Sequence, residues 1–459
     1  MRQGIIEVGT NAVRLVIYAD NNLGSAEIYV QRYKINISKL LNSENYNAND
    51  PFFRIIAHIN HILKLYNVKS YHCVATSVLR NHPNSQKFIN FISYKYNIDI
   101  EILSGKQEAH LNAVGIIVSI KNACGIVADL GGGSLELSVI ESNGQIGNHL
   151  SLEIGAKLTT NKCYITDNNI IKQLEEYKKS ISHYNKIYLI GGGFRVLGKK
   201  YFKTINYALK NLHSLEIATQ DLEYYINSNS SLNTYVSKVL KVLFDIFKPT
   251  KSIISNYSLK EGLRYTLLPQ HEKDKNLTVE MLKNLSLYAT YSKDILNQYC
   301  GLVIPWIIDQ NDQQTFQDIL EMALVVNSMS NSIDQNFRAN FLSQMVLTSN
   351  IPFAYRERVM LATIIFVTFK PFVVVPFYNL IKSTLSKTQY ISCVIIGKIL
   401  FLSGEIDGLT FHKPSFKLQY NLKNELTIHT SYLLPQDIFI KSKCILKYIQ
   451  KVHTTFKNK

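Results

Sequence analysis

The stretch Asp129-Leu-Gly-Gly-Gly-Ser-Leu-Glu136 decides the fold of this chain. It lies between the apolar runs 125–128 and 137–140, so it predicts a strand, a tight glycine turn and a second strand. Glycines leave backbone N–H groups uncovered, and a bound phosphate needs such donors. Asp129 and Glu136 place carboxylates at the two ends of the turn, where they suit a divalent metal on that phosphate. The alternative interpretation is a glycine-rich hairpin without a ligand, because short glycine motifs recur by chance.

The start of the chain repeats this pattern. Ile5-Ile-Glu7-Val-Gly9-Thr-Asn11 is an apolar strand followed by an acid, one residue, a glycine and polar residues, and 12–17 returns as a strand. The two hairpins indicate an internal repeat. A third glycine turn, Gly191-Gly-Gly193, follows the apolar run 187–190 and leads into a predicted helix. Together these segments predict a bilobed α/β protein that binds a phosphorylated ligand between its halves.

Composition favours a globular protein with anionic partners. The 459 residues are 46% hydrophobic and 18% charged, and the net charge is +16. Such a charge attracts nucleic acid, polyphosphate or anionic membranes, although a lysine-rich genome would give the same excess. The six cysteines show no C-x-x-C or zinc spacing, and the N-terminus enters a strand without a signal sequence. We therefore expect reduced thiols and a cytoplasmic location.

The second half of the chain has helical periodicity over about 277–400. Its most apolar segment, 359–369, is too short to span a bilayer, so we expect a buried core helix and no transmembrane segment. The last sixty residues alternate like strands. From residue 413 onward they carry nine lysines and two acidic residues, which indicates either a solvated face or an extension of an anion-binding groove.

The domain boundaries follow from these changes in pattern. The polar stretch 269–276 is typical of a linker. We predict an N-terminal lobe over 1–124, a second lobe over 125–270, and a mainly helical C-terminal domain with a basic tail over 277–459.

The motifs, taken in order, resemble the exopolyphosphatase/guanosine pentaphosphate phosphatase family of the actin–hexokinase–heat-shock ATPase superfamily, over about 1–270. The resemblance implies two ribonuclease H-like lobes that form a cleft, a mostly helical C-terminal domain, and a homodimer. The segments that carry it are Ile6-Glu-Val-Gly-Thr-Asn-Ala-Val-Arg-Leu15, Ala75-Thr-Ser-Val-Leu-Arg80, Gly105-Lys-Gln-Glu-Ala109, Asp129 to Leu137, Gly191-Gly-Gly-Phe-Arg195 and, loosely, Ser258 to Arg264.

The resemblance also implies the role of each site residue. Glu108 is the general base, at the start of a helix that faces the cleft. Asp129, Glu136 and Glu7 hold Mg²⁺ or order its water molecules. Arg14 either neutralises phosphate oxygens or is structural. The phosphate-binding residues are Gly9, Thr10, Asn11, Arg80, Gly131, Gly132, Gly133, Ser134, Gly191 and Gly192.

Four departures from the family pattern affect the expected activity. Glu7 replaces the first aspartate, and Gln107 replaces the first acid of a glutamate pair, which removes a negative charge beside the base. Leu135 and Gly193 each replace a threonine. None of them removes Glu108, so they leave reduced or retuned activity open.

The function expected first is Mg²⁺-dependent hydrolysis of the terminal phosphate of inorganic polyphosphate. The alternative substrate is guanosine pentaphosphate, cut at its 5′ end in the same site. A sugar or acid kinase of the superfamily is disfavoured, because 105–109 and 75–80 match the phosphatases. A non-catalytic polyphosphate-binding regulator is the third possibility, suggested by Glu7 and Gln107. We expect no nucleic acid partner.

Overall fold

The computed structural model divides into two compact units, the first over Met1–Tyr207 and Leu212–Leu277 and the second from Thr278 onward. The residues it describes are 1–41, 46–47, 49–155, 164–204, 212–229, 234–285, 293–408, 414–420, 425–431 and 433–457.

The first lobe of the first unit is a five-stranded sheet in the order β3-β2-β1-β4-β5. The strands β1, β2 and β3 form an antiparallel meander, and β4 and β5 extend the other side in parallel. The elements of this lobe are β1 (Gln3–Val8), β2 (Ala12–Tyr18), β3 (Glu27–Lys34), α1 (Ser38–Leu41), α2 (Pro51–Leu65), β4 (Ser70–Ala75), α3 (Ser77–Arg80), α4 (Ser85–Tyr96), β5 (Glu101–Ile102) and α5 (Gly105–Ser119).

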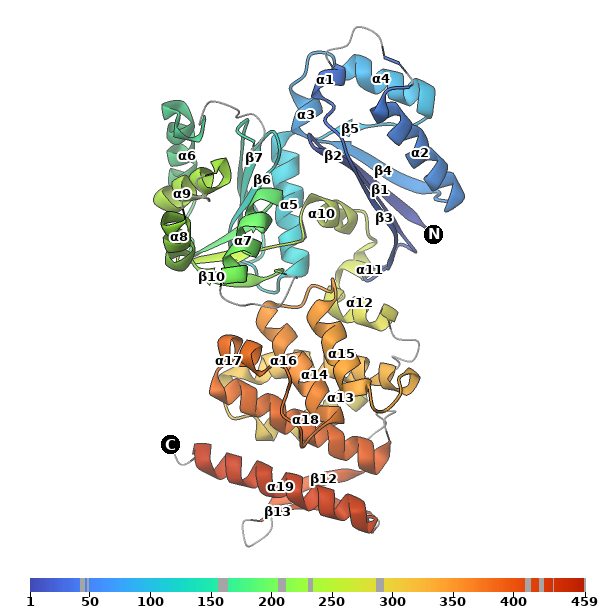
Figure 1. Ribbon diagram of the computed structural model, residues 1–459, viewed down its shortest axis with the longest axis vertical. Coiled ribbons are helices and arrows are strands. Elements are labelled where there is room, and N and C mark those ends of the chain that lie inside the picture. The colour runs from blue at the N-terminus through green and yellow to red at the C-terminus, as the bar shows by residue number, and fades with distance from the viewer. Residues whose placement is uncertain are drawn as a thin grey trace. The chain divides into compact units, whose positions relative to one another are not determined.

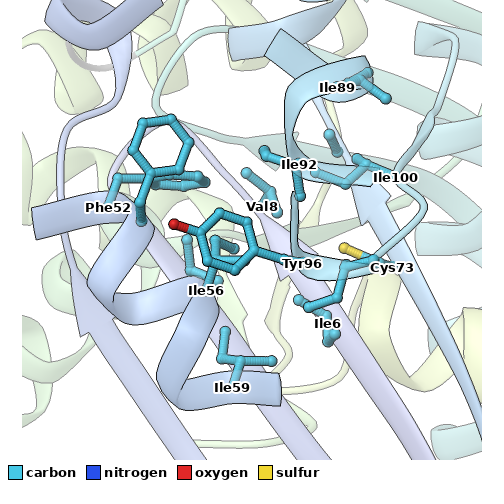
Figure 2. Packing of buried hydrophobic residues seen from close by; sticks show 14 of the residues in the cluster. Ile6, Val8, Phe52, Ile56, Ile59, Cys73, Ile89, Ile92, Tyr96 and Ile100 are labelled. Atoms are coloured by element: carbon cyan, nitrogen blue, oxygen red, sulfur yellow. The ribbon is translucent and has the colours of Figure 1, made fainter. Parts of the chain in front are cut away.

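Helices α2 and α4 lie beside this sheet and build the core of the lobe (Figure 1). The apolar residues of α2 recur three and four positions apart, which gives one continuous stripe. Figure 2 shows Phe52 and Ile56 of this stripe near Tyr96 of α4 and Ile6 and Val8 of β1. This packing holds β1 rigidly, so the turn that follows it has a defined position.

The second lobe repeats the topology of the first (Figure 1). Its strands β8-β7-β6-β9-β11 have the same order and directions as β3-β2-β1-β4-β5, and β10 adds an antiparallel edge. The expected fold of two ribonuclease H-like lobes is therefore confirmed. The elements are β6 (Gly125–Leu130), β7 (Leu135–Ile140), β8 (Ile146–Leu152), α6 (Asn168–Lys179), β9 (Lys186–Ile190), α7 (Gly192–Thr204), β10 (Leu215–Ala218), α8 (Thr219–Ser228), α9 (Tyr235–Phe247), β11 (Lys251–Ile254), α10 (Leu259–Thr266) and α11 (Gln270–Lys273).

The two hairpins that the sequence pattern singled out are equivalent in detail. Glu7 of β1 stands opposite Arg14 of β2, and Asp129 of β6 stands opposite Glu136 of β7. In each hairpin the glycine two residues after the acid donates its N–H to the carbonyl three residues further on, at 3.0 Å. The repeat therefore extends to the hydrogen bonds of the turns.

Helices α5 and α10 pack along one another and connect the second lobe to the first (Figure 1). Arg264 of α10 donates to Gln3 Oε1 at 3.0 Å and to the carbonyl of Asn22 at 2.6 Å. Its guanidinium also lies 3.7 Å from the centre of the Tyr18 ring. These contacts fix α10, and thereby α5, relative to the first sheet.

The second unit is mainly helical, as expected. Helix α16 contains the apolar segment 359–369 and is buried over most of its length, so the prediction of a core helix is confirmed. Helix α18 is long and apolar enough to cross a membrane, but 72% of its apolar window is buried inside this unit. The elements are α12 (Leu277–Leu285), α13 (Lys293–Val303), α14 (Gln313–Ser328), α15 (Arg338–Thr348), α16 (Tyr355–Phe369), α17 (Tyr378–Thr384), α18 (Lys387–Asp407), β12 (Phe416–Tyr420), β13 (Leu426–Thr430) and α19 (Gln436–Lys457).

The last sixty residues contain the expected strands and, in addition, a helix that the alternating pattern did not predict. The alternating segments do form the antiparallel pair β12–β13, but α19 follows as a helix of 22 residues. Ile445 and Ile449, four positions apart, are fully buried and anchor it. The strand prediction is therefore confirmed for β12 and β13 and wrong only for the segment that forms α19.

Candidate functional site

A cavity of about 220 Å³ lies in the first unit, where the turns of the two hairpins meet the start of α7. Its walls contain most of the predicted site residues. Arg80, Gly133 and Glu136 are described by the structure but are not among the lining residues. The predicted residues that line it are Glu7, Gly9, Thr10, Asn11, Glu108, Asp129, Gly131, Gly132, Ser134, Gly191 and Gly192.

The glycines of the second hairpin allow the two turns to approach each other. A Cβ atom on Gly132 would lie 2.7 Å from Asn11 Nδ2 of the first hairpin, and one on Gly133 would overlap the Ser77 hydroxyl. Gly191 has a φ of +96°, a conformation that side-chain-bearing residues rarely adopt. The glycines are therefore required by close packing and by one backbone turn, in addition to any contact with a ligand.

Glu108 reaches the cavity from the first turn of α5. Ser104 caps this helix: its hydroxyl accepts from the N–H of Gln107 at 3.2 Å, and the Gln107 side chain accepts from the N–H of Ser104 at 2.8 Å. Gln107 is exposed, and glutamine or glutamate serves equally in such a capping box. The departure from the family pattern at Gln107 therefore preserves the start of the helix that carries Glu108.

Arg80 joins two carboxylates behind the cavity wall. Its Nη1 donates to Glu108 Oε2 at 2.8 Å and to the carbonyl of Leu103 at 3.0 Å. Its Nη2 donates to Glu136 Oε1 at 3.2 Å, and that oxygen also accepts from the Ser151 hydroxyl at 3.2 Å. Arg80 therefore contacts carboxylates where the resemblance implied phosphate oxygens.

Burial controls the ionisation of these carboxyl groups. It raises the pKa of Glu108 to about 7, although the hydrogen bond and charge of Arg80 act in the opposite direction. Burial also raises the pKa of Glu136 well above its usual value, and the nearby charge of Glu108 adds to that shift. One guanidinium thus serves two acids, and Glu108 changes its charge close to neutral pH.

Asp129 is another acid in the lining of the cavity. Burial raises its pKa to about 6, the charge of Arg195 lowers it, and the charge of Glu7 raises it. Arg195 stands in the first turn of α7, where its Nε donates to the carbonyl of Ser255 at 3.1 Å. Asp129 and Glu7 therefore repel each other across the cavity when both are ionised.

The oxygen atoms around the cavity suit a hard divalent cation. Within the described part of the chain, no group of three or more His, Cys, Asp and Glu side chains has metal-binding geometry. Mg²⁺, however, is usually held by one or two carboxylates, with substrate phosphate and water completing its coordination. Glu7 and Asp129 supply two carboxylates, and Asn11 Oδ1 is buried without a hydrogen-bond partner among the described residues. This donor set fits Mg²⁺. Glu136 Oε1 accepts from Arg80, and its Oε2 is also buried without a hydrogen-bond partner among the described residues.

The structure adds two cations, Arg32 and Arg195, that the sequence reasoning did not assign to the site. Arg14, Arg32 and Arg195 all line the cavity, as do Thr76 and Ser258. Arg195 belongs to the motif Gly191-Gly-Gly-Phe-Arg195, so the sequence could have indicated that it lies at the site. Arg32 lies outside every motif, and only its register opposite Arg14 brings it to the site.

Comparison with known proteins finds a phosphatase family model and two curated relatives that match part of the chain. The model of the Ppx/GppA phosphatase family matches residues 16–238. The chain is 28% identical over 204 residues to a bifunctional 3-dehydroquinate synthase/phosphatase of Fusobacterium nucleatum, covering 38% of this chain and 31% of the relative. It is 25% identical over 197 residues to retrograde regulation protein 2 of Saccharomyces cerevisiae, covering 39% and 34%. The chain thus spans about a third of the length of these curated relatives.

Two solved structures are similar to part of the chain. The Aquifex aeolicus PPX-GPPA enzyme is 17% identical with a TM-score of 0.48, covering 57% of this chain and 98% of the other. An exopolyphosphatase from Cytophaga hutchinsonii is 22% identical with a TM-score of 0.48, covering 58% and 97%. Residues 16–238, which include Arg80, Glu108 and the second hairpin, are thus similar to the Ppx/GppA phosphatase family.

Proposed function

We propose that this protein is an exopolyphosphatase, which hydrolyses the terminal phosphoanhydride bond of inorganic polyphosphate. One observation carries the proposal: Glu108, with a pKa near 7, faces the same cavity as two glycine hairpins and three arginines. A carboxylate of that basicity suits proton abstraction at neutral pH. The surrounding amides and guanidiniums suit a polyanion.

In this reaction the residues of the cavity have different roles. Water attacks the terminal phosphorus in line with the bridging oxygen, and Glu108 accepts the proton of that water. The bond from phosphorus to the bridging oxygen breaks, which yields orthophosphate and a chain shorter by one unit. Ser134 and the turn residues Thr10 and Gly132 would bind the terminal phosphate, while Arg80 orients Glu108. When bound by Glu7 and Asp129, Mg²⁺ would neutralise charge on the phosphate oxygens.

Guanosine pentaphosphate remains the alternative substrate, because its 5′-triphosphate presents the same terminal anhydride. The test is orthophosphate release from long-chain polyphosphate and from guanosine pentaphosphate, measured side by side with Mg²⁺. A higher kcat/KM for polyphosphate supports the proposal, and a higher value for the nucleotide favours the alternative. Binding of polyphosphate without any release would support a regulatory protein. The proposed location is the cytoplasm.

The reaction should depend on pH through Glu108. A base acts only when ionised, and burial has raised the pKa of this carboxyl to about 7. We therefore expect kcat/KM to rise about tenfold per pH unit below pH 7 and to level off above it. The measurement is kcat/KM from pH 5.5 to 9 at constant ionic strength, with far-ultraviolet circular dichroism as a control for folding. A flat profile between pH 5.5 and 7 would contradict the role of Glu108.

Removal of the metal should abolish most of the activity. Treatment with EDTA is expected to reduce phosphate release by about 100-fold or more, because the charge on the phosphate oxygens is then not neutralised, and added Mg²⁺ should restore it. Asp129→Asn should raise the Mg²⁺ concentration for half-maximal activity by about tenfold, since one carboxylate ligand is lost. Asp221→Asn in α8, outside the lining of the cavity, is the control. An unchanged Mg²⁺ requirement in Asp129→Asn would argue against this metal site.

A further inference from the structure

Three charged residues form a row across the first sheet. The register places Glu7 of β1 opposite Arg14 of β2, and Arg14 opposite Arg32 of β3. Residues directly opposite on adjacent strands share a face of the sheet, and all three line the cavity. The row therefore leads from the centre of the site to the edge strand β3.

The row has an unbalanced charge at its outer end. Arg14 Nη1 is 3.3 Å from Glu7 Oε2, so these two side chains form an ion pair. Arg32 is exposed, and its guanidinium has no ion pair or hydrogen bond with any residue that the structure describes. Two arginines directly opposite each other on neighbouring strands repel. This arrangement costs stability unless an anion binds between or beside them.

The position of Arg32 in the first sheet, relative to Glu108, indicates which part of a substrate Arg32 would contact. Arg80 Nη1 donates both to Glu108 and to the carbonyl of Leu103, the residue after β5, so Glu108 lies near β5, the edge strand on the opposite side of the sheet from β3. Adjacent strands are about 4.8 Å apart, so Arg32 is about 10 Å beyond Glu7 in the direction away from Glu108. With the terminal phosphate beside Glu108, Arg32 is therefore positioned to contact the part of the substrate that remains after cleavage.

We propose that Arg32, together with Arg14, binds the retained phosphate groups of a linear polyphosphate and gives the site its preference for a condensed phosphate chain. This inference rests on the proposed function and adds a specificity-determining residue to it. A guanidinium pairs with phosphate oxygens through two parallel hydrogen bonds, which a lysine cannot reproduce. The repeating phosphate units supply such oxygens at every position along the row, whereas a nucleotide places a ribose after its third phosphate.

The test compares Arg32→Ala and Arg32→Lys with a control, Arg54→Ala. Arg54 is exposed on α2 and lies outside the lining of the cavity. Substrates are long-chain polyphosphate, tripolyphosphate and guanosine pentaphosphate. For Arg32→Ala we expect the KM for the long chain to rise about tenfold, the KM for the two short substrates to change less, and the dependence of KM on salt to weaken. Arg32→Lys should be intermediate, and Arg54→Ala should match the parent protein.

Equilibrium binding separates failure of this inference from failure of the proposed function. Binding of long-chain polyphosphate to Glu108→Gln should weaken about tenfold when Arg32→Ala is added. If the parent protein hydrolyses polyphosphate but Arg32→Ala leaves its KM and salt dependence unchanged, the inference is overturned and the proposed function stands. A loss confined to guanosine pentaphosphate also overturns it. If the parent neither binds nor hydrolyses polyphosphate, both fail.

Discussion

Replacing Glu108 with glutamine is expected to lower kcat for phosphate release by about 10²–10⁴-fold, the usual contribution of a general base. Glutamine keeps the size of the side chain, and its amide oxygen can still accept from Arg80 Nη1. The structure of the site should therefore survive, while the group that accepts the proton of water is lost. The measurement is kcat and KM for long-chain polyphosphate, with binding of the same polymer as an independent readout.

A second glutamate, Glu101, provides the control for this experiment. Glu101 lies on β5, seven residues before Glu108, and is exposed outside the lining of the cavity. Glu101→Gln should keep the kcat of the parent protein. If Glu108→Gln retains more than half of the parent kcat, Glu108 is not the base. If it loses polymer binding instead, Glu108 contributes to affinity rather than to proton transfer.

Replacing Gly262 with alanine should give the largest loss of stability. Its Cβ atom would overlap the carbonyl oxygen of Leu111 and lie 2.8 Å from the carbonyl carbon of the same residue. Both atoms belong to the backbone of α5, which cannot move aside as a flexible side chain can. We expect a cost of about 3 kcal/mol or more. Because α5 also carries Glu108, any displacement should reduce activity as well.

The control for this experiment comes from another helical glycine. Nothing lies within 4 Å of a Cβ atom built on Gly301 in α13, so Gly301→Ala should stabilise its helix by about 0.5–1 kcal/mol. Trp306 is the sole tryptophan and belongs to the second unit, so its fluorescence follows that unit. Gly262→Ala should lower the denaturation midpoint seen by loss of activity but not the tryptophan midpoint. Equal midpoints for Gly262→Ala and the parent protein would contradict the packing argument.

Much of the fold could be predicted because its signals are local. An acid, a glycine two residues later and a returning apolar strand define a hairpin whether or not the rest of the chain is known. The same is true of the turn at Gly191 and of the helix start at Ser104. The C-terminal helix α19 was missed, because its two fully buried residues, Ile445 and Ile449, can be recognised as a packing face only when the tertiary structure is known.

The candidate site could be predicted only in part, because two of its ion pairs join residues that are far apart in the sequence. Glu108 and Asp129 were found from motifs. The pairing of Arg80 with both Glu108 and Glu136 joins residues up to 56 positions apart, and no local pattern contains it. Gln107 was interpreted as a lost negative charge, whereas its side chain closes a capping box.

By itself, the sequence determined the duplicated hairpins, the third glycine turn and the helix that presents Glu108, because each depends on backbone preferences within a few residues. The tertiary structure alone decided which charges are neutralised. Cross-strand register leaves Arg32 without a partner among the described residues, and burial raises the pKa of Glu108 to about 7. Both effects arise from atoms that are distant in sequence, since charge pairing and desolvation depend on distance in space.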